Sequence, residues 1–348
     1  MSGLGRLIDD EFADWDGPRH LEEEIFGTGD GDRIAACVDR FCARELGSPI
    51  ERYEFFASSV MSVHGVRLRD ERRVVVKAGR PRVDAEYLSA VQLVQARLIS
   101  QQFPCPRPVL GPTALAGGVA VVEELLDRGL RASAHDPPIR AAMARGLARI
   151  VECCRELGDL PGLGPSLFAS PAAGALWPQP HDARFDFTGT AGGAEWIDAL
   201  AARARTRLAA GCGALVVGHC DWRAEHVRFE GEALVATYDW QSLAVVREPE
   251  LVGAAAHAFT ADWRTHQARR LPTLDEARAF VADYEAARAA RFSPAERAAI
   301  DAAWVYATAY GARCEHCDER RGMAWAGGTS REDSYRGLLA RNGEALLA

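Results

Sequence analysis

The chain has 348 residues, too many for a single small hydrophobic core, so we expect two lobes or domains. Its formal net charge of −8 argues against a nucleic-acid-binding surface, which is normally basic, and no apolar run reaches the roughly 18 residues that a membrane-spanning helix needs. We therefore expect a protein that binds neither nucleic acid nor membrane. The first segment has no signal-peptide pattern, and the number of cysteines is odd, at nine. Both features predict a cytoplasmic protein with reduced thiols.

The first part of the chain predicts a β-rich region preceded by a helical extension. Residues 1–50 are acidic and interrupted by glycine at first, and apolar residues then recur with a helical period over 34–46. Short β-branched and aromatic runs follow, separated by one amphipathic segment. We expect an antiparallel meander, a helix and a further strand over 51–79, 84–101 and 119–124.

Lys77 lies at the end of the predicted meander and is the only lysine among 41 basic residues. Coding bias in a GC-rich genome replaces surface lysines by arginine easily, because both are solvated cations there. A lysine that remains indicates a position where a compact ammonium is needed and a planar guanidinium does not fit. Lys77 is therefore a candidate binding residue, with chance retention of a solvated lysine as the alternative.

The rest of the chain is predicted to be mainly helical, with helices over 137–157, 194–210, 274–289 and 294–313. A β-rich island interrupts them, with apolar runs at 214–218, 227–229 and 233–238. Polar residues are densest in GHCDWRAEH at 218–226, and YDW follows at 238–240. Asp221 and Asp239 each follow a short apolar strand, so we expect both carboxylates at the same end of neighbouring strands.

Two such carboxylates suit phosphoryl transfer. One accepts the proton of an attacking hydroxyl, and the other holds a Mg²⁺ ion that bridges the β- and γ-phosphates of a nucleotide. A distant lysine would neutralise the phosphates, and Lys77 is the only one in the chain. The alternative is that Asp221 and Asp239 are turn residues that cap strands.

Taken in order, these segments resemble the aminoglycoside phosphotransferases and the related choline kinases. HCD at 219–221 and YDW at 238–240 are similar to the catalytic and metal-binding segments of that family. VVVK at 74–77 resembles the strand with its ATP lysine, the helix running into FPCPR at 103–107 resembles the αC helix, and VVEEL at 121–125 resembles the adenine-binding hinge. The resemblance extends over residues 50–345.

The resemblance implies an α+β, two-lobed protein-kinase-like fold. The N-lobe would span residues 1–124, with a helical extension over 1–50 and a small antiparallel sheet with an αC-like helix over 51–124. A larger, mainly helical C-lobe would span 125–348. It would contain a catalytic loop at 218–226 and a metal-binding strand at 235–241.

The resemblance also implies roles for individual residues. Asp221 would be the catalytic base and Asp239 the metal ligand. His219 would tie the catalytic loop to nearby backbone, and Arg223 would contact phosphate or brace the loop through Glu225. ATP or GTP would be held by phosphate-binding residues and by backbone groups of the hinge, which are Lys77, Ser59 in a phosphate-covering turn at 58–65, and Glu123, Glu124 and Leu125.

Two departures from the family pattern bear on activity. His226 stands where the family has asparagine, and imidazole is a poor ligand for Mg²⁺. His226 would therefore either help to bind a softer ion such as Mn²⁺ or hydrogen-bond a phosphate or Asp221. The αC glutamate that should pair with Lys77 is also missing, because Gln92 and Gln95 occupy the expected positions and the ion pair is absent or rebuilt.

We therefore expect an enzyme that moves the γ-phosphoryl of ATP or GTP to a hydroxyl of a small molecule, using Mg²⁺ or Mn²⁺. Aminoglycoside-like compounds, amino sugars and amino alcohols are the candidate acceptors. Two alternatives remain open. One is a nucleotide-binding pseudokinase, which both departures favour. The other is a metal-dependent hydrolase built on His219, Asp221, His226 and Asp239, which would leave Lys77 without a role.

Overall fold

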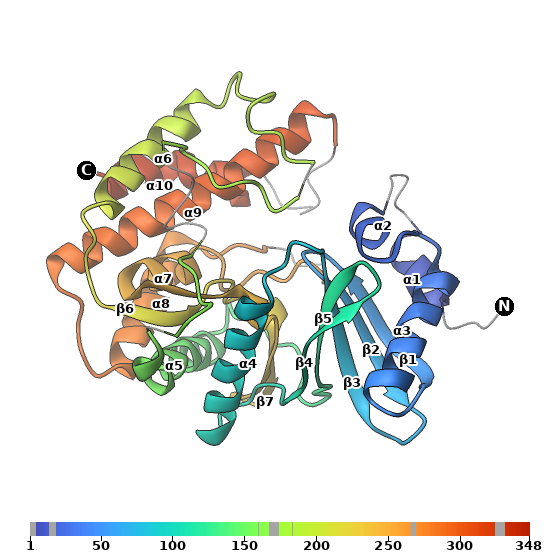
Figure 1. The fold of residues 1–348 in the computed structure, drawn as a ribbon. Coiled ribbons are helices and arrows are strands. Elements are labelled where there is room, and N and C mark those ends of the chain that lie inside the picture. Colours follow the sequence, from blue (N-terminus) through green and yellow to red (C-terminus); the bar gives the residue numbers. More distant parts are fainter. Residues whose placement is uncertain are drawn as a thin grey trace. The chain divides into compact units, whose positions relative to one another are not determined.

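The computed structural model describes residues 5–13, 19–158, 160–166, 174–182, 184–265, 269–323 and 331–348. The chain divides into two compact units. The first contains residues up to Ser100 and Cys105–Asp127, and the second contains Gln101–Pro104 and Arg128–Ala348. Helices and strands both contribute to each unit, as an α+β fold requires (Figure 1).

A five-stranded antiparallel sheet with the order β1-β2-β3-β5-β4 forms the centre of the first unit. The predicted meander is confirmed as β1 (Ile50–Ser58), β2 (Ser62–Leu68) and β3 (Arg73–Gly79), and the predicted strand that follows is β5 (Gly118–Glu124). In the register between β3 and β5, Lys77 lies opposite Val121. Lys77 is thereby placed on a central strand of the sheet.

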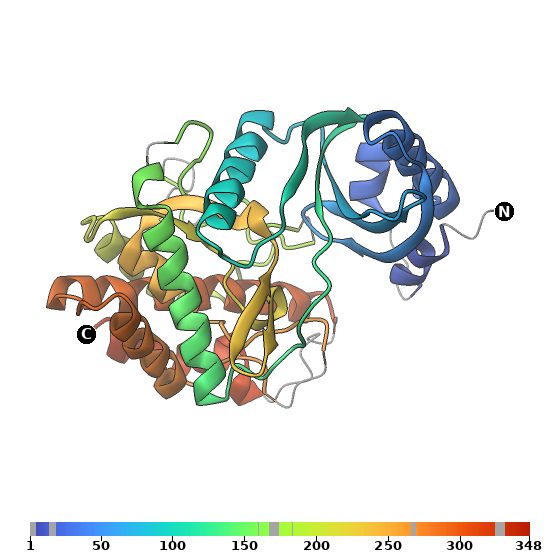
Figure 2. The same cartoon turned by 90° about the horizontal axis from the view of Figure 1, so that it is seen from below.

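Helices pack on both faces of this sheet (Figures 1 and 2). One face carries Val76 and Val122 and forms the main core with the predicted extension, which consists of α1 (Arg6–Glu11), α2 (His20–Phe26) and α3 (Gly31–Glu45). The other face carries Val121, which packs against Leu88 of α4 (Ala85–Ser100). Because side chains alternate along a strand, Lys77 shares this second face with Val121.

Strand β4 (Pro108–Leu115) was not predicted from the sequence. Pro108, Gly111 and Pro112 weaken its strand pattern, since proline cannot donate to a ladder and glycine has no side chain to pack. The strand is tolerated because it lies at the edge of the sheet and pairs only with β5, with two register shifts along the way. An edge position therefore explains why the sequence pattern failed here.

Helices dominate the second unit. The four predicted helical segments are confirmed as α5 (Pro137–Cys153), α6 (Glu195–Leu208), α8 (Leu274–Ala287) and α9 (Pro294–Arg320), and α7 (Glu248–Ala256) and α10 (Tyr335–Leu346) are additional. Helices α8 and α9 begin at capping boxes, Thr273 with Glu276 and Ser293 with Glu296, which satisfy backbone N–H groups of the first turn. Among the described residues, no helix has both the length and the apolar character needed to cross a membrane.

The β-rich island of the second unit consists of two separate two-stranded sheets. Strand β6 (Leu215–His219) pairs with β9 (Leu243–Arg247), and β7 (Val227–Glu230) pairs with β8 (Ala233–Thr237). The expectation that Asp221 and Asp239 follow neighbouring strands is therefore wrong, because β6 and β8 belong to different sheets. The reason is that the chain turns back after Asp239, so that the unpredicted strand β9 supplies the partner of β6.

Candidate active site

The loop that carries Asp221 leaves the end of β6 and is anchored on both sides by buried groups. The Trp222 side chain is 2% exposed, and its Nε1–H donates to the carbonyl oxygen of Met143 on α5 at 3.0 Å. The backbone N–H of Ala224 donates to the carbonyl of Phe259 at 2.8 Å. These bonds fix the loop against α5 and against the turn at Phe259, and the buried Trp222 side chain packs beside the loop.

His219 joins the Asp221 loop to the turn that carries Asp239. Its ring is fully buried, and Nε2 lies 2.9 Å from the carbonyl oxygen of Tyr238. Because a carbonyl can only accept, Nε2 must carry the hydrogen in this bond. Nδ1 lies 3.0 Å from the Ser242 hydroxyl. Burial, and then the neighbouring His226, lower the pKa of His219, which keeps the imidazole neutral.

Asp239 follows β8 in an unusual backbone conformation. Its φ of 59° and ψ of 47° lie in the left-handed region, where aspartate is tolerated better than most other side chains. The Ser242 hydroxyl donates to the carbonyl oxygen of Asp239 at 2.9 Å, and the fully buried Trp240 donates through Nε1 to Thr237 at 3.2 Å. A strained backbone conformation of this kind persists only where surrounding contacts stabilise it, and here these contacts fix the orientation of the Asp239 carboxylate.

The structure brings Asp221, His226 and Asp239 together. One ligand atom from each side chain lies within 4.8 Å of the other two. The Nε2 atom of His226 is 3.2 Å from Oδ2 of Asp221 and 3.7 Å from Oδ2 of Asp239. The two carboxylates are 40% and 42% exposed, so an ion could reach them from solvent.

Arg223 contacts two members of this cluster. Its Nη2 is 2.9 Å from Oδ2 of Asp221, and its Nε–H donates to Nε2 of His226 at 3.0 Å. Burial by itself would raise the pKa of Asp221, but the charges of Arg223 and His226 outweigh this effect and lower the pKa well below its usual range. Asp221 is therefore ionised throughout the physiological pH range. Nη2 of Arg223 is also 3.9 Å from Oε2 of Glu225, so its contact with Asp221 is the closer of the two.

The protonation of His226 decides which of its contacts can form. Arginine can only donate, so Nε2 must be unprotonated to accept from Arg223. The same Nε2 must carry a proton to donate to Asp221. Only the unprotonated form could bind a metal ion. With that form, two carboxylate oxygens and one imidazole nitrogen fit a divalent cation, and the nitrogen suits Mn²⁺ better than Mg²⁺.

In the first unit, Lys77 has a carboxylate partner. The family pattern led us to expect this partner on the αC-like helix, but it lies on β5. The Nζ of Lys77 lies 2.6 Å from Oε1 of Glu123 on β5, and the two side chains are 7% and 5% exposed. Gln95 of α4 donates through Nε2 to the other carboxylate oxygen at 3.0 Å, while Gln92 donates to the carbonyl of Leu110. The alternation of side chains along β5 places Glu123 on the face of Lys77, a signal readable only once the strand register is known.

The remaining predicted nucleotide-binding residues lie at the ends of the strands. The backbone N–H groups of Glu124 and Leu125 already donate to Arg107 and Arg73, at 2.8 and 3.0 Å. A nucleotide contact at these two residues would have to use other groups. Ser59 is exposed between β1 and β2, and its N–H donates to Met61 at 3.2 Å. The turn is thus shorter than the predicted 58–65, because β2 already begins at Ser62.

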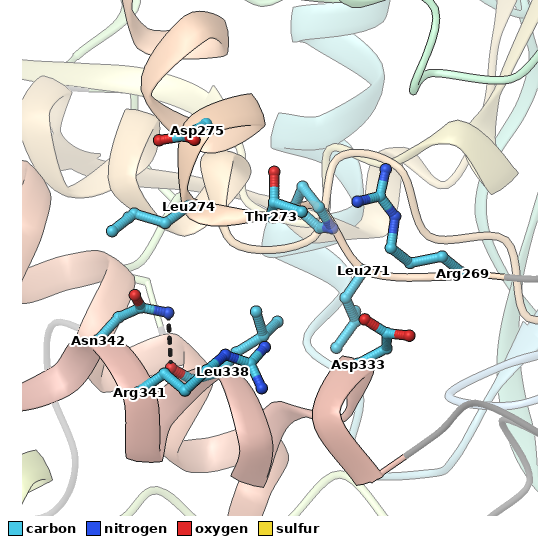
Figure 3. Close-up of a pocket in the computed structure, with 10 residues that line it drawn as sticks. Arg269, Leu271, Thr273, Leu274, Asp275, Asp333, Leu338, Arg341 and Asn342 are labelled. Atoms are coloured by element: carbon cyan, nitrogen blue, oxygen red, sulfur yellow. Dashed lines mark hydrogen bonds between the residues drawn. The ribbon is translucent and has the colours of Figure 1, made fainter.

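A cavity of about 250 Å³ in the second unit contains none of the predicted site residues. It lies where the start of α8 faces α10 (Figure 3). Its lining includes Arg269, Thr273, Asp275, Asp333, Arg341 and Asn342. Arg269 also contacts Glu276 at 2.8 Å, and Asn342 donates to the carbonyl of Leu338. The lining mixes cations and acids, some of them already paired, so it does not indicate a ligand.

Neither a family model nor a curated protein sequence matches this chain. Solved structures do match in fold. Amicoumacin kinase hAmiN, in complex with AMP-PNP, Ca²⁺ and Ami, is 10% identical with a TM-score of 0.61, and the match covers 91% of this chain and 95% of that one. A thermostable mutant of aminoglycoside phosphotransferase APH(4)-Ia is 14% identical, with a TM-score of 0.52 and coverage of 89% and 98%.

Macrolide 2′-phosphotransferase MphH from Brachybacterium faecium is 15% identical, with a TM-score of 0.50 and coverage of 86% and 97%. The predicted α+β, protein-kinase-like fold is therefore confirmed, and the resemblance to the aminoglycoside phosphotransferases holds at the level of the fold. Fold by itself does not determine activity, which has to be argued from the site.

Proposed function

We propose that this chain is a small-molecule kinase, which transfers the γ-phosphoryl group of ATP or GTP to a hydroxyl of a small acceptor. The observation that carries the proposal is the cluster of Asp221, His226 and Asp239, in which one ligand atom of each side chain lies within 4.8 Å of the other two. The fold shared with solved structures of a kinase and a phosphotransferase supports it. Two carboxylates, one near the attacking hydroxyl and one on the metal ion, are the groups that protein-kinase-like phosphoryl transfer uses.

Asp221 is the proposed catalytic base. The charge of Arg223 lowers its pKa, so the carboxylate is ionised and able to accept a hydrogen bond from the acceptor hydroxyl. A carboxylate with so low a pKa is a weak base, and strong deprotonation of the hydroxyl before attack is not expected. Phosphoryl transfer through a loose transition state needs little base strength early in the reaction. Asp221 would therefore orient the hydroxyl and receive its proton late.

Asp239 and His226 are the proposed ligands of a divalent cation, with Asp221 close enough to contribute an oxygen. A divalent cation held there would offset the charge of the β- and γ-phosphates. Lys77 is the proposed phosphate-binding cation of the first unit, together with the turn at Ser59. Amine-bearing alcohols, such as aminoglycosides, amino sugars and amino alcohols, are the proposed acceptors.

A metal-dependent hydrolase is less well supported by the geometry. That alternative uses His219 as a metal ligand, but both ring nitrogens of His219 face protein groups, at 2.9 and 3.0 Å. One of the two arguments for a pseudokinase no longer holds, because Lys77 does have a buried carboxylate partner. The other argument, that His226 stands where the family has asparagine, remains.

Nucleotide binding and turnover test the proposal directly. Thermal unfolding would be followed with ATP and GTP, each with Mg²⁺ and with Mn²⁺, and phosphorylated products would then be sought by mass spectrometry across a panel of hydroxyl-bearing amines. We expect a nucleotide- and metal-dependent rise in the unfolding temperature and transfer that the Asp221→Asn variant abolishes. Asp275→Asn, a change at a nearly fully exposed carboxylate, serves as the matched control. Tightly bound zinc or iron without nucleotide affinity would refute the kinase and favour the hydrolase.

A further inference from the structure

The ion pair between Lys77 and Glu123 is built entirely within the sheet of the first unit. Lys77 lies opposite Val121 on β5, and Glu123 is two residues further along the same strand. Both side chains therefore emerge on one face, with Nζ and Oε1 separated by 2.6 Å. Since both are more than nine-tenths buried, neither charge could remain in place without the other or an equivalent partner.

Helix α4 contributes an amide to this pair instead of a carboxylate. Gln95 is 1% exposed and donates from Nε2 to Oε2 of Glu123 at 3.0 Å and to the carbonyl of Pro106 at 3.4 Å. The only acid in the sequence of α4 is Glu86, which lies exposed in the first turn. Gln95 therefore orients the carboxylate of Glu123, and the negative charge itself comes from β5.

We propose that Glu123 is the positioning residue for Lys77, holding its ammonium group where the nucleotide phosphates bind. This inference rests on the proposed kinase function. Glu123 would then act through its side chain, and not through the hinge contact that the sequence suggested. The acid partner that α4 lacks would be supplied by strand β5.

The position of the pair follows from strand register. Strands β3 and β5 are joined by a continuous antiparallel ladder from Val74 to Gly79, so the distance between Lys77 and Glu123 is set by backbone hydrogen bonds. A partner on a helix would instead depend on how that helix docks on the sheet. The ion pair between Lys77 and Glu123 therefore forms without any movement of α4.

The single lysine makes a direct test of the contact possible. An amine-reactive reagent can modify only Lys77 and the chain's α-amino group, and peptide mass spectrometry separates the two. In the wild-type protein, Nζ is buried against the carboxylate of Glu123, so modification is slow. We expect Glu123→Gln to raise the modification rate of Lys77 at least fivefold, and ATP to slow modification in the wild-type protein.

Turnover and rescue test the positioning role. We expect Glu123→Gln to lower phosphoryl transfer, or ADP release without acceptor, at least tenfold while leaving adenosine affinity unchanged. Adding Gln95→Glu to that variant returns a carboxylate from the helix side, and should bring turnover to within threefold of wild type. If the role of the pair were purely structural, Glu123→Gln would lower the free energy of unfolding but leave turnover per folded molecule unchanged, so turnover is measured on the folded fraction.

Glu54→Gln is the matched control, because it breaks an ion pair with Arg73 on the same strand, at 2.8 Å, away from Lys77. It should leave ATP protection and turnover within twofold of wild type. Should Glu123→Gln not fold, Glu123→Asp keeps the charge but withdraws it by one methylene, and should lower turnover at least threefold.

Three results would overturn the inference: wild-type turnover in folded Glu123→Gln, wild-type turnover in Glu123→Asp, or a double variant no better than the single one. Failure of the proposed function has a different signature. A wild-type protein that neither binds ATP nor transfers phosphate would refute the kinase, whereas a modification rate unchanged in Glu123→Gln would refute the contact itself.

Discussion

Replacing Glu315 by glutamine should change how the stability of this protein depends on pH. Glu315 lies on α9, is 5% exposed, and accepts the backbone N–H groups of Tyr335 and Arg336, which open α10, at 2.8 and 2.9 Å. Burial raises the pKa of Glu315 to about 7, although these hydrogen bonds and the charge of Arg336 act in the opposite direction. The carboxyl group is thus forced to ionise in a dry environment as pH rises.

The sign and size of the effect follow from linkage. Between the ordinary glutamate pKa of 4.5 and the folded-state value of about 7, the folded protein binds more protons than the unfolded chain. The contribution of Glu315 to stability is then greatest below the lower value and is lost as pH rises through the upper one. At about 1.4 kcal/mol per pKa unit, the loss between pH 5 and pH 8 is at most about 3 kcal/mol.

Urea unfolding at a series of pH values measures how the free energy of unfolding depends on pH. Glu315→Gln removes the contribution of this one carboxyl group, so we expect the wild type to lose up to about 3 kcal/mol relative to the variant between pH 5 and pH 8. The variant also has a cost of about 1 kcal/mol, because an amide nitrogen cannot accept the second backbone N–H group. Glu319→Gln is the matched control, since Glu319 lies one turn further along α9, is 49% exposed and pairs with the same Arg336. A difference in unfolding free energy between wild type and Glu315→Gln that stays the same from pH 5 to pH 8 would contradict the reasoning, as would a difference that grows in favour of the wild type.

Three further changes test the site. Asp221→Asn should lower phosphoryl transfer by about a thousandfold or more while calorimetry still detects ATP binding, and retained turnover would remove the proposed base. His226→Asn should shift metal preference from Mn²⁺ towards Mg²⁺, and an unchanged ratio of the two affinities, with Mn²⁺ binding followed by electron paramagnetic resonance, would exclude His226 as a ligand. Trp222→Phe should cost about 1 kcal/mol of unfolding free energy through loss of its bond to Met143, which thermal unfolding would measure; an unchanged stability would argue against that bond.

Much of the local structure was readable from the sequence, because it depends on periodicity over neighbouring residues. The β-branched run that ends at Lys77 predicted a buried strand, and β3 is one. The apolar stripe through Leu88 and Val91 predicted α4, and both side chains are buried against their surroundings. The clustering of polar residues around Asp221 and Asp239 also drew attention to the two loops that the structure brings together with His226.

Other features depend on pairing between distant segments, which periodicity does not encode. Strand β4 contains Pro108 and Pro112 and is stabilised by its neighbour β5 at the sheet edge. Strand β9 is short and was not predicted, yet its pairing with β6 places Asp221 beside the turn of Asp239. A carboxylate at the end of a strand is visible in sequence, whereas the strand beside it is not.

The sequence by itself therefore singled out the candidate site residues: a single lysine, two aspartates after short strands, and a histidine where the resembling family has asparagine. Only the tertiary structure decided their partners. It assigned Glu123 to Lys77 and Arg223 to Asp221 and His226, through distances that no spacing rule predicted. The physical reason is that strand register and loop anchoring bring side chains together across the chain, and these are properties of the folded backbone.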